Sequence, residues 1–222
     1  MVQNLQRPLV VGVVHDPRGA TSKERKQFFM REWKGIREGI SALPHGAKIG
    51  LELTKEDVES IQNFCKRTES PVADLMRKAR KTGIRDVFIT GAVVSISKKY
   101  EIVALDNRTM HRRAGEVKGK IGEINKKVRR VEVELLRRQR QQNFEGLNLQ
   151  EIERGLGTLN SKLQELYKKL DLYNVLRSKH MAETMLAEMP AVSFVGDGHA
   201  REISEVFPKE FRFSFSPEAA KK

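Results

Sequence analysis

Two short stretches near opposite ends of the chain share one construction, in which an apolar, strand-like run leads into Gly-x-x-His. The first is VVGVVHDP at residues 10–17, and the second is VSFVGDGHA at residues 192–200. Neutral imidazole is a common ligand of Zn, Fe, Mn and Co ions in proteins. Because the same construction occurs twice, we expect His15 and His199 to meet in one metal site.

The two histidines occupy the positions where α/β proteins build their sites. In an open α/β sheet, ligands bind just beyond the carboxyl ends of the strands. The strands predicted at 8–14 and 191–195 each end shortly before one of the histidines. If these strands are parallel neighbours, both imidazoles emerge at the same edge of the sheet. The glycine three residues before each histidine allows another backbone to approach closely.

Two further predicted strands end in carboxylates. Glu52 lies at the end of AKIGLEL (47–53), and Asp106 at the end of YEIVALD (100–106). Burying an unpaired carboxylate in an apolar strand is costly, so a functional reason for these residues is expected. Glu52 would be a general base or a further ligand, and Asp106 a ligand or a partner that orients a histidine. Two histidines and these carboxylates form a set of nitrogen and oxygen donors suited to Mn, Co, Fe or Zn.

The elements that must position these residues alternate between strand and helix. Strands are predicted at 8–14, 47–53, 85–90, 100–106 and 191–195, with an edge strand at 211–216. Helices are predicted from Thr21 or Ser22 to about Leu43, from 55 to 67 after Thr54, and from Pro71 to Lys81. This alternation predicts an α/β fold with a largely parallel central sheet flanked by helices.

A different periodicity separates the fourth of these strands from the last. Apolar residues recur at spacings of four and three on both sides of the break NFEGLNLQ. Such spacing predicts an inserted antiparallel helical hairpin, a coiled-coil-like arm. We therefore divide the chain into a first part of the α/β core (1–108), a basic helical hairpin (109–189), and the final strands and helix of the core (190–222).

The positive charge of the chain is concentrated in this arm. The formal net charge is +13, and residues 111–142 contain eleven Lys and Arg against four Glu. These residues are either the solvated face of a coiled coil or a surface for an acidic partner or for self-association, including a homodimer. Arg112 and Arg113 are candidate substrate-binding residues for an anionic group. Nucleic acid is a weaker expectation, because none of the fourteen aromatic residues clusters with the basic run.

Composition narrows the class of protein. No apolar run approaches the 18 or so residues of a membrane helix, and no secretion signal is recognisable at the N-terminus. Cys65 is the single cysteine, so an internal disulfide and a thiolate-rich zinc cluster are both excluded. These features favour a cytoplasmic protein.

The order of the motifs resembles the TraB/Tiki family, which belongs to a wider group with erythromycin esterase-like and ChaN-like proteins. The resemblance rests on GVVH, IGLEL, IVALDNRTMHRRA and VLRSKHMAETMLAEMPAVSFVGDGHA, which together span most of the chain outside the arm. It implies a metal-dependent hydrolase-like site, with proteases among the relatives. Matched residue by residue, it points to His15, Glu52, Asp106, Arg177 and His199. Arg177 would stabilise an oxyanion or fix a carboxylate.

The sequence thus predicts a metal-dependent hydrolase, similar to a protease or peptidase, acting on a peptide or a small-molecule substrate. The alternative is a non-catalytic binding or scaffold protein of the same fold, which uses the basic arm for dimerisation or for an acidic partner. Salt sensitivity separates these possibilities, since charge-driven binding weakens steeply with salt whereas a dry helical seam does not.

Overall fold

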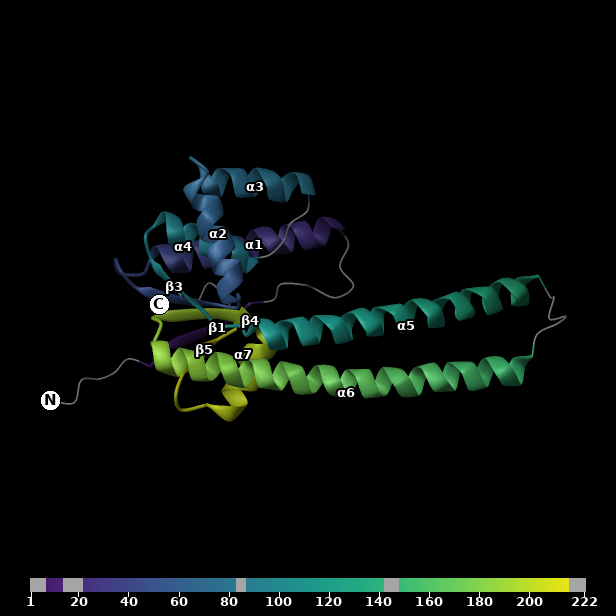
Figure 1. The fold of residues 1–222 in the computed structure, drawn as a ribbon. Coiled ribbons are helices and arrows are strands. Elements are labelled where there is room, and N and C mark those ends of the chain that lie inside the picture. The colour runs from purple at the N-terminus through teal and green to yellow at the C-terminus, as the bar shows by residue number, and fades with distance from the viewer. Residues whose placement is uncertain (1–6, 14–21, 83–86, 142–147, 216–222) are drawn as a thin grey trace. The chain divides into compact units, whose positions relative to one another are not determined.

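The structure is a computed structural model, and it describes residues 7–13, 22–82, 87–141 and 148–215. Within these ranges the chain forms a five-stranded, all-parallel sheet in the order β3-β2-β4-β1-β5 (Figure 1). The strands are β1 (Leu9–Val13), β2 (Lys48–Leu51), β3 (Glu101–Ala104), β4 (Val192–Gly196) and β5 (Arg212–Ser214). The predicted α/β class with a parallel sheet flanked by helices is confirmed.

The two strands that precede the histidine motifs are direct neighbours. β1 pairs with β4 in parallel, and Val13 lies opposite Gly196 in the register. Both strands are almost entirely buried, which explains why their sequences are continuously apolar rather than alternating. The strands that lead into the two Gly-x-x-His motifs, β1 and β4, are therefore adjacent and parallel, as expected.

Each face of the sheet has its own hydrophobic core. Val11, Val13 and Phe194 point into a core shared with helices α1 (Ser22–Ser41), α2 (Lys55–Lys66), α3 (Pro71–Thr82) and α4 (Val87–Ser97). Val10 and Val195 point to the opposite face, where they pack with helix α7 (Asp197–Val206) and the last part of helix α6 (Leu149–Glu188). Alternating side chains of a strand thus pack against two different layers of helices.

One predicted strand is wrong. Residues 85–90 were expected to form a strand, whereas the structure places helix α4 from Val87 and leaves 85 and 86 outside the described residues. α4 is buried on almost every side, and a short apolar run cannot distinguish a buried helix from a buried strand. Gly91 allows α4 to approach α1 closely, because a Cβ there would lie 3.3 Å from Ile36 Cγ2.

The remaining core predictions agree with the structure. α2 begins after Thr54, whose hydroxyl accepts from the Asp57 backbone N–H while the Asp57 carboxylate accepts from the Thr54 N–H. This capping box satisfies two backbone N–H groups at the start of α2, three residues after β2 ends at Leu51. β5 is an edge strand, as predicted for FRFSFS, but its burial does not alternate, since Phe213 and Ser214 are both half-buried and Phe215 is exposed.

The basic segment forms two long helices, α5 (Arg108–Arg140) and α6. In both, the apolar residues of the four-three repeat are buried or half-buried, while most of the residues between them are exposed. The antiparallel pairing of the two helices stays a prediction, and residues 142–147 between them lie outside the described ranges. Dimerisation and an acidic partner also stay predictions.

The chain divides into two compact units. One unit holds residues 1–108 and 175–222, and the other holds residues 109–174. The second unit ends at 174, and the arm expected from the sequence at 109–189 stays a prediction. Met181, Ala182 and Met185 of α6 are fully buried in the core beside the sheet, so this part of α6 belongs to the first unit. No helix within the described ranges is long and apolar enough to cross a membrane, and the cytoplasmic location stays a prediction.

The centre of the sheet offers a test of its packing. A Cβ at Gly50 of β2 would collide with Ser193 Oγ of β4 and would lie 3.0 Å from Leu105 Cδ1. Ser193 Oγ is buried and has no hydrogen-bond partner among the described residues. We therefore expect Gly50→Ala to lower the free energy of unfolding by about 1–3 kcal/mol. Ser193→Ala should keep or raise it, since an unsatisfied buried hydroxyl is costly.

Chemical denaturation measures the free energy of unfolding. It should be applied to the wild type, both single variants and the double variant. The Gly50→Ala cost should be smaller in the Ser193→Ala background, where the closest colliding atom is absent. Equal costs in both backgrounds would contradict the packing described here.

Candidate functional site

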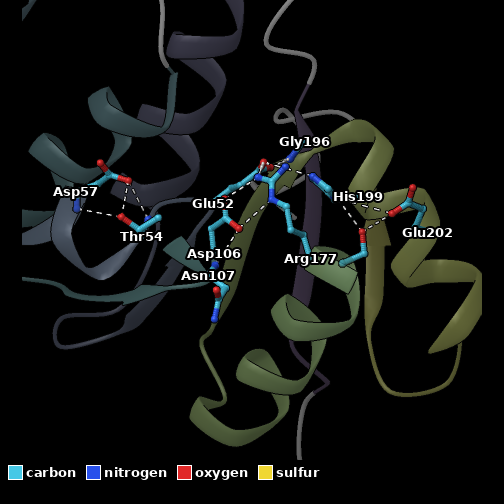
Figure 2. Close-up of polar contacts among 10 residues, drawn as sticks. Glu52, Thr54, Asp57, Asp106, Asn107, Arg177, Gly196, His199 and Glu202 are labelled. Atoms are coloured by element: carbon cyan, nitrogen blue, oxygen red, sulfur yellow. Dashed lines mark hydrogen bonds and ion pairs between the residues drawn. The ribbon is translucent and has the colours of Figure 1, made fainter. Parts of the chain in front are cut away.

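A buried arginine joins two strand ends at the carboxyl edge of the sheet. Arg177 of α6 donates from Nε to Asp106 Oδ1 (3.0 Å) and from Nη2 to Asp106 Oδ2 (2.6 Å) (Figure 2). The same Nη2 donates to Glu52 Oε1 (2.9 Å). The three side chains are only 5%, 1% and 7% exposed, in the order Arg177, Asp106 and Glu52. One guanidinium therefore fixes two carboxylates that come from different strands.

The environment of Arg177 keeps its positive charge. Burial acts to lower the pKa of Arg177, but the hydrogen bonds and charges of Asp106 and Glu52 together raise it above the usual value. Arginine suits this role because its planar fork binds a carboxylate through two parallel hydrogen bonds. Two carboxylates against one guanidinium leave the buried triad with one net negative charge.

Asp106 supports the guanidinium from the end of β3. Its backbone N–H donates to the Leu53 carbonyl (3.0 Å), and its Oδ1 also accepts from the Asn107 N–H (2.9 Å). Both carboxylate oxygens face Arg177. These contacts favour a positioning role for Asp106, and its assignment as a metal ligand stays a prediction.

Glu52 connects the triad to the second histidine motif. Its backbone N–H donates to the Phe194 carbonyl (3.1 Å), which continues the pairing of β2 with β4. Its Oε2 accepts from the Gly196 N–H (2.5 Å), and its Oε1 lies 3.5 Å from His199 Nε2. The glycine of the second Gly-x-x-His motif thus holds one oxygen of Glu52 while the histidine faces the other (Figure 2).

His199 lies in the first turn of α7 and is 9% exposed. Its Nδ1 is 2.7 Å from Ser178 Oγ, and Ser178 also donates to Glu202 Oε2. Burial acts to raise the pKa of Glu202, but its interactions with His199 and Ser178 and the charge of Arg177 hold it below the usual value. The imidazole therefore lies between two carboxylate side chains, with Glu52 Oε1 3.5 Å from Nε2 and Glu202 reached from Nδ1 through Ser178.

The glycine of the first motif allows α7 to lie close to β1. A Cβ at Gly12 would lie 3.1 Å from Ala200 Cβ and 3.2 Å from Asp197 Oδ1. Contacts this short are tighter than most side chains make, so the close approach of the first turn of α7 favours glycine at this position of β1. The two glycines thus act differently. Gly12 leaves space for α7, and Gly196 donates its backbone N–H to Glu52.

The structure brings together four of the residues predicted from the sequence, namely Glu52, Asp106, Arg177 and His199. Of the two roles expected of Arg177, its contacts favour fixing carboxylates. His15 lies outside the described residues, two positions beyond Val13. Arg112 and Arg113 are exposed and belong to the other unit, so their predicted substrate-binding role is not tested.

Sequence reasoning missed Ser178 and Glu202. Ser178 directly follows Arg177 on α6, and Glu202 lies one helical turn beyond His199 on α7. The spacing of three residues between His199 and Glu202 is a usable signal, because side chains at that distance share a helix face. For Ser178 no such signal exists without the fold, since its partners are 21 and 24 residues away.

The metal prediction is not tested by this geometry. In the part of the chain that the structure describes, no group of three or more His, Cys, Asp or Glu side chains is arranged to hold a metal ion. The chain matches no family model, no curated protein and no solved structure. The resemblance to the TraB/Tiki family and the hydrolase function therefore stay predictions.

The buried triad predicts a large cost for removing its arginine. Arg177→Met leaves two carboxylates buried without their cation, and breaking a buried pair in this way costs about 3–5 kcal/mol. The matched control is Arg108→Met, which removes an ion pair with Glu56 (3.0 Å) that is exposed to solvent and therefore contributes little to stability. Thermal and chemical unfolding of both variants measures the difference. Equal losses of stability would show that Arg177 is not the interaction that holds the site.

Proposed function

We propose that this protein is a metal-dependent hydrolase that cleaves an ester or amide bond in a peptide or small-molecule substrate. The observation that supports the proposal is the short distance between His199 Nε2 and Glu52 Oε1. These two atoms are 3.5 Å apart, and they lie beyond the carboxyl ends of parallel strands. β1, the strand that leads to His15, is the direct neighbour of β4. In this proposal His15 follows β1 and joins His199 at the same edge of the sheet.

The donors at this edge suit a divalent ion. Imidazole nitrogen with carboxylate oxygen is the donor combination of Zn, Fe, Mn and Co sites. Metal–ligand bonds in such sites are about 2.0–2.2 Å long, which places two neighbouring ligands of a tetrahedral ion about 3.3–3.6 Å apart. The separation of 3.5 Å between His199 Nε2 and Glu52 Oε1 fits that spacing. His15 would complete the set as a third ligand.

The charge of the cluster also favours a cation. Glu52, Asp106 and Arg177 together carry one net negative charge in a buried setting, and Glu202 adds a further carboxylate beside His199. A bound divalent ion would offset charge that is costly to bury.

Each residue of the site has a definite role in this proposal. Glu52 and His199 hold the ion, and Arg177 and the Gly196 N–H fix the Glu52 carboxylate so that Oε1 faces His199. Asp106 keeps Arg177 in place through both of its oxygens. The ion, when bound, supplies Lewis acidity and lowers the pKa of a coordinated water towards neutrality. A rigid set of donors costs little reorganisation during the reaction.

Metal binding by the purified protein tests the proposal. After chelator treatment, the wild type should bind one equivalent of Mn, Co or Zn by equilibrium dialysis or calorimetry and should hydrolyse peptide or ester test substrates only when the metal is returned. Loss of a ligand should weaken binding at least as much as loss of an outer partner, which costs about 10–100-fold. We expect this for His199→Gln and for Glu52→Gln.

His45→Gln is the matched control, because His45 is an exposed turn residue before the start of β2, at the opposite end of that strand from Glu52. It should bind metal like the wild type. Unchanged metal affinity in both His199→Gln and Glu52→Gln, or the absence of any binding in the wild type, would contradict the proposed function.

A further inference from the structure

Helix α6 contributes two consecutive residues to the site, and each holds a different partner. Arg177 fixes the Glu52 carboxylate, and Ser178 contacts the imidazole of His199. Ser178 is 3% exposed, so its hydroxyl has been removed from water and depends on these protein contacts. A single turn of α6 thus determines how Glu52 and His199 face each other (Figure 2).

The hydroxyl of Ser178 has one proton and two candidate acceptors. It lies within hydrogen-bond distance of both Glu202 Oε2 and His199 Nδ1. An ionised carboxylate can only accept a hydrogen bond, whereas a ring nitrogen of histidine can donate or accept. If the proton of Ser178 points to Glu202, then the Ser178 oxygen must accept the N–H of His199 Nδ1.

The reverse arrangement requires a protonated Glu202. Were Ser178 to donate to His199 Nδ1, Glu202 would have to supply a proton of its own to Ser178 Oγ. The carboxylate of Glu202 also lies 3.7 Å from His199 Nδ1, where a nearby N–H is favourable and a lone pair is not.

We propose that Ser178 and Glu202 are positioning residues that hold His199 in the tautomer protonated at Nδ1. In this tautomer Nε2 carries a lone pair that faces Glu52 Oε1 across 3.5 Å. Two electron-rich atoms at that distance favour a cation or a polarised water between them. A histidine whose second nitrogen donates to an oxygen partner is the usual arrangement of a metal ligand. The use of this Nε2 lone pair to bind a metal rests on the proposed function, whereas the tautomer of His199 does not.

Nitrogen-15 NMR of the metal-free full-length protein, labelled at histidine, measures the tautomer directly. We use about pH 8, well above the usual histidine pKa of about 6.5. The Nδ1 signal of His199 should be pyrrole-like and the Nε2 signal pyridine-like, with the assignment made by their loss in His199→Gln. In Ser178→Ala and Glu202→Ala the population should move towards the Nε2–H form, whereas Ser178→Thr should keep the wild-type pattern because it retains the hydroxyl.

Glu205→Ala is the matched control, since Glu205 is an exposed carboxylate on the same helix. It should leave the His199 signals unchanged. If Ser178→Ala does not fold, Glu202→Ala still decides, because the Glu202 side chain is 35% exposed and tolerates truncation better. A pyridine-like Nδ1 in the wild type, pyrrole-like signals from both nitrogens, or unchanged signals in Glu202→Ala would overturn the inference.

Metal affinity separates this inference from the proposed function. Ser178→Ala should weaken metal binding about 10–100-fold, as expected for loss of an outer partner of a ligand. If the wild type binds no metal but shows the Nδ1–H tautomer, the inference holds and the proposed function fails. If the wild type binds metal through His199 with Nε2 protonated in the metal-free state, the proposed function holds and the inference fails.

Discussion

The structure of the site depends on one buried guanidinium. Arg177 is nearly inaccessible to water, and its charge must be met by protein groups because an unpaired buried cation is very costly. Arg177 donates two hydrogen bonds to Asp106 at the end of β3 and a third to Glu52 at the end of β2. Helix α6 and two strands are therefore held in one arrangement by a specific charge pattern in addition to apolar packing.

That arrangement gives His199 its chemical setting. The parallel pairing of β1 with β4 places Gly12 and Gly196 on neighbouring strands, and Gly12 leaves room for the first turn of α7. Gly196 then holds one oxygen of Glu52, so that the other oxygen faces the imidazole. Buried polar groups of this kind stabilise a site only when each has its partner, which makes the contacts of Ser178 and Glu202 as important as those of Glu52.

Particular residues show how far the sequence allows prediction. The apolar strands around Gly12 and Gly196 and the carboxylates at Glu52 and Asp106 were predictable, because strand ends in an α/β sheet meet at one edge. The segment from Val87 was predicted as a strand although it is a helix, since it is buried on all sides and shows no periodicity. Ser178 was not predicted, because only the packing of α6 against the sheet reveals what its hydroxyl contacts.

Anomalous diffraction from crystals grown with Mn²⁺ tests the central claim most directly, which is that His199 and Glu52 jointly hold a divalent ion. The account predicts an anomalous peak between His199 Nε2 and Glu52 Oε1, with Arg177 still bound to Asp106 and Glu52. The peak should disappear in Glu52→Gln crystals of the same form. A site without a peak at saturating Mn²⁺, or a peak that persists in that variant, would contradict the claim.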